Sequence, residues 1–176
     1  MVDTETWGLT PGSHIRSIGG VRFDPEQGSL GEKFYCNVAP QPSYGLTSAE
    51  DTRLWWSRQS FDAREALSRK QLDLVVALKR FGVWFEGLAV DASTIRLWAH
   101  GPQFDCSILD ACYRATGLPV PWHYRAPRDC RTILEAAGMD PTTDFPAVGI
   151  EHNALDDAVS QALGVMEAFH RLRTHA

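Results

Sequence analysis

The order of strand-like and helical segments along the chain limits its fold more than any other feature. Residues 2–6, 14–23 and 33–38 are rich in side chains that favour strands. The turn signals Thr-Pro-Gly-Ser at 10–13 and Asp-Pro-Glu-Gln-Gly at 24–28 separate them. Three such segments with short connections predict an antiparallel meander in the first third of the chain.

Helical signals dominate the remaining two thirds. Thr47 and Glu50 have the spacing of a capping box and predict a helix that runs through Trp55 and Trp56. Periodic apolar positions and end signals predict further helices over residues 69–85, 104–116, 129–137 and 153–172, with one strand at 94–99. This order predicts a single α/β domain, residues 1–176, whose sheet of mixed antiparallel and parallel strands is flanked by α-helices.

Composition and cysteine spacing indicate the compartment. No apolar run approaches the roughly 18 residues of a membrane span, and no signal-peptide pattern opens the chain. The four cysteines are scattered without a C-x-x-C pair, which favours small buried residues over disulfides or a zinc site: Cys36, Cys106, Cys112 and Cys130. We therefore expect a cytoplasmic protein with no membrane partner.

The net charge of −5 restricts the partners. Proteins that coat long duplexes are usually basic, so the acidity argues against that class. It is compatible with an enzyme that holds a few nucleotides at a site where metal ions offset carboxylates. Residues 112–131 contain four arginines and a single acid, Asp129, and could follow a phosphate backbone, although a solvated face explains any one arginine equally well.

Acidic residues fall at three points where a predicted strand ends or a helix begins. Asp3 and Glu5 are two apart in a strand and share one face, while Asp105 opens a helix. The segment His-Asn-Ala-Leu-Asp-Asp at 152–157 opens the last helix. Taken singly, each cluster also has a purely structural explanation. Asp3 and Glu5 could be solvated acids near the chain end. The acids at the two helix starts could complement the helix dipole, with Asn153 as an N-cap.

Taken together, the clusters indicate a metal site. Ligands in open α/β sheets usually lie at strand ends, and hard divalent cations need several oxygen ligands. Four carboxylates and one histidine can build a two-metal site for phosphodiester hydrolysis. A neutral histidine beside the attacking water is a general base that works near neutral pH.

These residues resemble the three motifs of the DEDDh superfamily of 3′–5′ exonucleases. The motifs are Asp3-x-Glu5-Thr6-x-Gly8, then Phe104-Asp105, then His152-x-Ala154-x-x-Asp157. Within the superfamily, the chain resembles most the phage exonuclease VIII-like group and the mycobacterial 3′–5′ exoribonuclease. The stretches that carry this likeness are IRSIGGVRF at 15–23, WWxxQS at 55–60, CRTIL at 130–134 and HNALDDA at 152–158.

The resemblance implies a bacterial or phage-encoded protein with an RNase H-like fold and two divalent cations, Mg²⁺ or Mn²⁺. It implies that the carboxylates of Asp3, Glu5, Asp105 and Asp157 hold these ions and that His152 is the general base. The spacing of the third motif selects Asp157 rather than Asp156.

The resemblance also implies contacts with the terminal nucleotide from the residues that follow the first motif: Thr6, Trp7, Gly8 and Leu9. Phe104 and Trp56 are further candidates for substrate contact. Adjacent helical residues point about 100° apart, so we expect at most one of Trp55 and Trp56 to face a substrate groove. A place in the core or at a subunit interface remains an alternative for either ring.

The predicted function is removal of nucleotides from the 3′ end of single-stranded RNA or DNA, with RNA favoured by the resemblance. Two alternatives stay open: a nucleic-acid-binding module that has lost catalysis, and a hydrolase of short oligonucleotides or nucleotides. Several members of the superfamily are homodimers, so the resemblance also makes a homodimer plausible.

Overall fold

The first three strands form the predicted meander. The structure is a computed structural model that describes residues 1–40 and 43–174. Strands β1 (Val2–Thr6), β2 (Ile15–Asp24) and β3 (Ser29–Val38) pair antiparallel, and the short β4 (Gln71–Leu72) adds to β3 in parallel. A second, parallel pair consists of β5 (Leu97–Ala99) and β6 (Pro127–Asp129), and β5 contacts β1. The prediction of mixed strand direction is confirmed.

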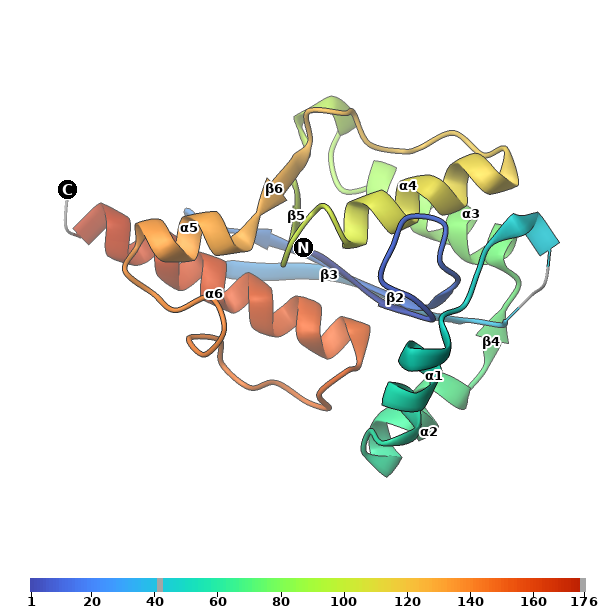
Figure 1. The fold of residues 1–176 in the computed structure, drawn as a ribbon. Helices are drawn as coiled ribbons and strands as arrows, with labels where there is room; N and C mark the ends of the chain where they lie inside the picture. Colours follow the sequence, from blue (N-terminus) through green and yellow to red (C-terminus); the bar gives the residue numbers. More distant parts are fainter. Residues whose placement is uncertain (41–42, 175–176) are drawn as a thin grey trace.

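Helices cover both faces of the meander (Figure 1). The helix α6 (Ala154–Thr174) crosses β2 and β1 and packs with α5 (Cys130–Ala136) around one hydrophobic core. On the other face, α3 (Leu74–Glu86) and α4 (Asp105–Thr116) bury a second core. The small helices α1 (Glu50–Ser57) and α2 (Phe61–Ser68) follow β3, and Trp56 of α1 donates to the Thr6 carbonyl at the end of β1. Two 3₁₀ turns complete the elements, η1 (Ser43–Gly45) and η2 (Ala92–Thr94).

The close packing of α6 on β2 depends on Gly19. A Cβ atom at this position would collide with the backbone carbonyl of Ala154, the first residue of α6. In the β1–β2 register Gly19 lies opposite Asp3. The missing side chain therefore lets the start of α6 approach the strand that carries Asp3.

Two predicted helix starts are wrong. Thr47 does not cap α1: its N–H donates to the Gly12 carbonyl and its own carbonyl accepts from His14, both at 2.9 Å, and the N-cap position is Ala49. The helix expected from residue 69 begins at Leu74, since residues 71–72 pair with β3 instead. The helix α2 and the strand β6 were not predicted. Local periodicity cannot reveal a two- or three-residue strand whose only support is a distant partner.

The cysteine prediction agrees with the structure, in which all four side chains are free and buried. Among the described residues, no helix has the length and apolar character needed to cross a membrane.

Candidate active site

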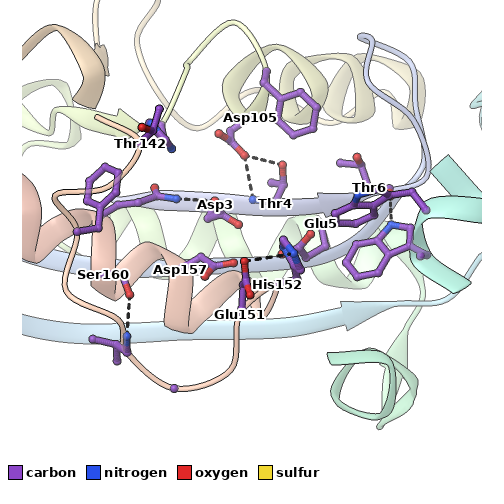
Figure 2. A pocket seen from close by; sticks show the side chains of 18 of the residues that line it. Asp3, Thr4, Glu5, Thr6, Asp105, Thr142, Glu151, His152, Asp157 and Ser160 are labelled. Atoms are coloured by element: carbon purple, nitrogen blue, oxygen red, sulfur yellow. Dashed lines mark hydrogen bonds and ion pairs between the residues drawn. The ribbon is translucent and has the colours of Figure 1, made fainter. Parts of the chain in front are cut away.

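One pocket of about 920 Å³ collects all five predicted catalytic residues (Figure 2). Asp3 and Glu5 enter it from β1, Asp105 from the start of α4, and His152 and Asp157 from the start of α6. The far wall is the segment between α5 and α6, which contributes residues 142, 145–149 and 151. Segments distant in sequence thus meet at the end of the first strand.

The alternation of β1 sets the directions of the first acids. Asp3 and Glu5 point toward α6, whereas Thr4 between them points toward α4. Met1 extends the pairing of the strand, because the Val21 N–H donates to its carbonyl at 3.0 Å and its ammonium donates to the Val21 carbonyl at 2.8 Å. The short strand β1 is therefore paired with β2 both before and after Asp3.

Asp105 is fixed by Thr4. Its Oδ1 accepts hydrogen bonds from the Thr4 N–H at 2.9 Å and from the Thr4 hydroxyl at 2.8 Å. Only 2% of Asp105 is exposed. Thr4, which lies between Asp3 and Glu5 on β1, thus holds the Asp105 carboxylate at the pocket through two donors.

Gln161 is a site residue that the motifs did not indicate. It lies on α6, four residues after Asp157, and its Nε2 donates to Asp3 Oδ1 at 2.8 Å. The side chain is buried, and its Oε1 has no hydrogen-bond partner among the described residues. A glutamine one helical turn after a metal-site aspartate, among apolar positions, is the sequence signal that could have found it.

The start of α6 orients His152 and Asp157. The Asn153 side chain accepts from the N–H groups of Leu155 and Asp156 at 3.1 and 3.3 Å, so it caps the helix as expected. His152 has a left-handed backbone with φ of 63°, and its N–H donates to the Asp157 carboxylate. This turn brings ligand atoms of Glu5, His152 and Asp157 within 4.8 Å of one another.

Asp156 has a different role from its neighbour. Its Oδ2 accepts from the Ile150 N–H at 2.8 Å, and it does not line the pocket. The Ser160 hydroxyl in turn accepts from the Val148 N–H at 3.2 Å. These two bonds tie the far wall of the pocket to α6.

The pocket disfavours the charged carboxylates unless cations enter. Burial raises the pKa of Asp105 and of Asp157 to about 7. Burial and the neighbouring carboxylates raise the pKa values of Asp3 and Glu5 well above their ordinary range. No lysine or arginine is among the described residues that line the pocket. The donor set therefore fits divalent cations, which would supply the missing positive charge.

Of the predicted substrate contacts, four line the pocket: Thr6, Leu9, Phe104 and Trp56. Leu9 is 73% exposed at its rim. Trp7 and Gly8 do not line it. The Gly8 carbonyl accepts from the Thr6 hydroxyl at 2.7 Å, and Trp7 lies in a neighbouring pocket.

The two adjacent tryptophans both line the pocket, contrary to the expectation that at most one would, and they differ in exposure. Trp56 is only 3% exposed, and its Nε1 donates to the Thr6 carbonyl at 2.8 Å. Trp55 is 42% exposed, lines the pocket, and places its ring centre 4.8 Å from that of His152. The open ring is thus Trp55, which was not among the predicted substrate contacts.

Comparisons with known proteins agree with this geometry. The family model described as the 3′–5′ exoribonuclease Rv2179c-like domain matches residues 1–169. Comparison with curated proteins gives no match.

Solved structures share the fold at low identity. The nuclease domain of 3′hExo, a DEDDh family member bound to rAMP, has a TM-score of 0.59 and 17% identity over 98% of this chain and 90% of that one. Cell-death related nuclease 4 (CRN-4) has a TM-score of 0.61 and 12% identity, covering 96% of this chain and 63% of that one. Product-bound exonuclease I has a TM-score of 0.62 and 15% identity, covering 98% and 42%. The chain therefore spans less than two thirds of the length of two of these three.

The shared fold confirms the predicted RNase H-like mixed sheet flanked by helices. The family match covers nearly the whole chain and agrees with the motif resemblance. The chain belongs to the family of 3′–5′ exoribonuclease Rv2179c-like domains.

Proposed function

We propose that this protein is a 3′–5′ exonuclease that removes nucleotides from single-stranded RNA or DNA with two divalent cations, Mg²⁺ or Mn²⁺. One observation carries the proposal: four carboxylates and a histidine from three distant segments share one pocket whose described lining has no basic side chain other than histidine. Such a set is costly in a protein that only binds anions, because the carboxylates repel a phosphate. It suits a protein that recruits cations for hydrolysis.

The proposed division of labour follows from the contacts. Asp3, Glu5, Asp105 and Asp157 would hold the cations, and Thr4 and Gln161 would keep two of these carboxylates oriented. When bound, the cations supply positive charge for the attacking water and for the leaving oxygen. The His152 imidazole accepts the proton of the attacking water, and Trp55 restricts its ring from one side.

RNA is the favoured substrate in this proposal. The family is described as exoribonuclease, and 3′hExo was solved with rAMP. The rim formed by Leu9 and Trp55 offers apolar surface for an unstacked terminal base. Homodimer formation and action in the cytoplasm are part of the same proposal, and light scattering of the purified protein tests the first.

The direct test is cleavage of 5′-labelled single-stranded RNA and DNA oligomers with Mg²⁺, Mn²⁺ or EDTA. We expect a ladder that shortens from the 3′ end and that EDTA abolishes. The variant His152→Ala should lower kcat about 10²–10⁴-fold, the usual contribution of a general base. The matched control His170→Ala changes an exposed histidine on α6 outside this pocket and should cleave like the wild type.

The same assay separates the alternatives. If the wild-type protein binds oligomers but cleaves none with either metal, it is a nucleic-acid-binding module. Rates that are high on a dinucleotide and negligible on a twenty-nucleotide strand would make it a hydrolase of short oligomers.

A further inference from the structure

A second pocket, of about 450 Å³, lies directly behind Trp56 and has the opposite charge character. Its described lining contains three arginines and no acid: Trp7, Arg16, Pro40, Ser48, Arg53, Trp56, Ser57 and Arg64. The arginines come from three different elements, β2, α1 and α2. We call this the arginine pocket. In a chain of net charge −5, these three arginines concentrate positive charge at one place.

Arg16 is held rigidly in this pocket. Its guanidinium carbon lies 3.9 Å from the centre of the Trp7 ring and 4.2 Å from that of Trp56. Stacking between aromatic faces fixes the plane of the guanidinium before any ligand arrives. Its Nη1 is buried and has no hydrogen-bond partner among the described residues. Part of the Arg16 charge faces the Glu5 carboxylate, and the fixed guanidinium also contributes positive charge to the wall of the arginine pocket.

Arg53 and Arg64 complete the cationic character. Both are exposed, and neither makes an ion pair or a side-chain hydrogen bond with another described residue. Two free guanidinium forks beside a fixed one match the oxygens of a phosphate group.

The position of the pocket indicates which phosphate it receives. Trp56 lines both this pocket and the active-site pocket, so the two pockets adjoin at this side chain. A strand whose 3′ end lies at the carboxylates must pass its remaining phosphates over neighbouring surface, and the active-site pocket itself offers them no arginine or lysine among its described residues.

We propose that the arginine pocket binds a backbone phosphate of the single-stranded substrate, one or two nucleotides away from the scissile bond. The inference rests on the proposed function, because that function supplies the strand. It assigns the affinity for the strand to Arg16, Arg53 and Arg64, and leaves hydrolysis to the metal site. It also explains how an acidic protein holds a polyanion: the positive charge is local.

The test measures binding without cleavage, in a protein that carries Asp157→Asn. A 5′-fluorescein single-stranded RNA dodecamer is titrated in Mg²⁺ at several salt concentrations and followed by anisotropy. The double change Arg53→Gln with Arg64→Gln should weaken dodecamer binding about tenfold. It should also reduce the slope of log K against log salt by about 0.7 for each phosphate that the variant no longer neutralises. The weakening should be larger for the dodecamer than for a dinucleotide.

The matched control removes the same charge elsewhere. Lys79 and Arg80 are exposed on α3 and line neither pocket, so Lys79→Gln with Arg80→Gln should leave affinity and salt slope within twofold of the parent. Because Arg53 and Arg64 are exposed, both double variants should keep the parent Tm, which shows that folding is intact.

Two results would overturn the inference. One is equal dodecamer affinity and equal salt slope in the two double variants. The other is a rise in Tm on adding inorganic phosphate that is lost in Arg53→Gln with Arg64→Gln, while dodecamer binding is kept. That result would make the pocket a site for free phosphate only. Failure of the proposed function is a separate observation, since the wild type would then bind the dodecamer and not shorten it.

Discussion

Asp3 owes its orientation to one buried amide. The Nε2 atom of Gln161 donates to Asp3 Oδ1, and the burial of Gln161 leaves water little access to replace it. Partners of metal-binding carboxylates commonly control affinity for the ion, because they fix the direction of the ligand oxygen. Under the proposed function, Gln161 is therefore a positioning residue and not a catalytic one.

We expect Gln161→Leu to weaken Mn²⁺ binding about 10–100-fold, the range usual for the loss of such a partner. Electron paramagnetic resonance of free Mn²⁺ measures this without reference to cleavage. The control Gln27→Leu changes an exposed glutamine in the β2–β3 turn and should bind Mn²⁺ like the wild type. Equal affinities in the two variants would show that Asp3 needs no support from Gln161.

The adjacent tryptophans should separate activity from stability. Trp55→Ala removes an exposed ring beside His152, so kcat/KM on single strands should fall about tenfold, as expected when a base can no longer stack on an aromatic ring, with the Tm unchanged. Trp56→Ala empties a buried site and removes the hydrogen bond to the Thr6 carbonyl, so it should lower the free energy of unfolding by about 3–5 kcal/mol. Steady-state kinetics and thermal unfolding of both variants check the split. Wild-type kinetics in the Trp55→Ala protein would show that the Trp55 ring takes no part in substrate binding.

At the scale of elements, the contact between β2 and α6 decides whether the site forms. Asp3 and Glu5 belong to β1, whereas His152 and Asp157 precede and open α6. They meet because Gly19 lets the first residue of α6 rest on the sheet. The sequence IRSIGGVRF predicted a strand here, yet it did not reveal which glycine faces a helix.

Gly19→Ala should lower the free energy of unfolding by about 1–3 kcal/mol, since its methyl group must displace the start of α6. It should also reduce cleavage, because His152 and Asp157 move with the helix. The control Gly82→Ala lies inside α3, where a Cβ atom comes no closer than 3.6 Å to its neighbours, and should stabilise by about 0.5–1 kcal/mol. Chemical denaturation measures both. A Gly19→Ala protein as stable as the wild type would mean that this packing tolerates adjustment.

At the scale of the whole molecule, the metal site and the stability of the fold are linked. The pKa values of Asp105 and Asp157 rise from 3.8 to about 7 on folding because of burial. Between these values the two carboxyl groups bind more protons in the folded protein than in the unfolded chain. Their contribution to stability is therefore fully present below about pH 4 and is lost as the pH rises through about 7. Divalent cations bind the deprotonated carboxylates and oppose this loss.

We therefore expect the metal-free protein to lose on the order of a few kcal/mol of stability between about pH 5 and about pH 8 from these groups. Added Mn²⁺ should raise the Tm more at the higher pH. Asp105→Asn should flatten the pH dependence, whereas Asp62→Asn, on the exposed start of α2, should leave it unchanged. Differential scanning calorimetry with EDTA or Mn²⁺ measures these shifts. A stability that rises across this range in EDTA would contradict the charge repulsion inferred for the pocket.

The sequence by itself determined the meander, the main helices and the four carboxylates and the histidine that the pocket collects. Strand alternation, turn residues and helix ends are local properties, so residues a few positions apart reveal them. The acids could be recognised from the sequence because their spacing matches the motifs of a known superfamily. The approximate positions of α3 to α6 followed in the same way, although the first turn of α3 did not.

Only the tertiary structure decided the contacts that make the pocket work. Gln161 meets Asp3 across 158 positions of the chain, and Asp105 meets Thr4 across 101. The pairing of β4 and β6 and the grouping of Arg16, Arg53 and Arg64 likewise depend on distant partners. Such contacts leave no periodic trace, because the free energy that selects them comes from packing and burial in the folded chain.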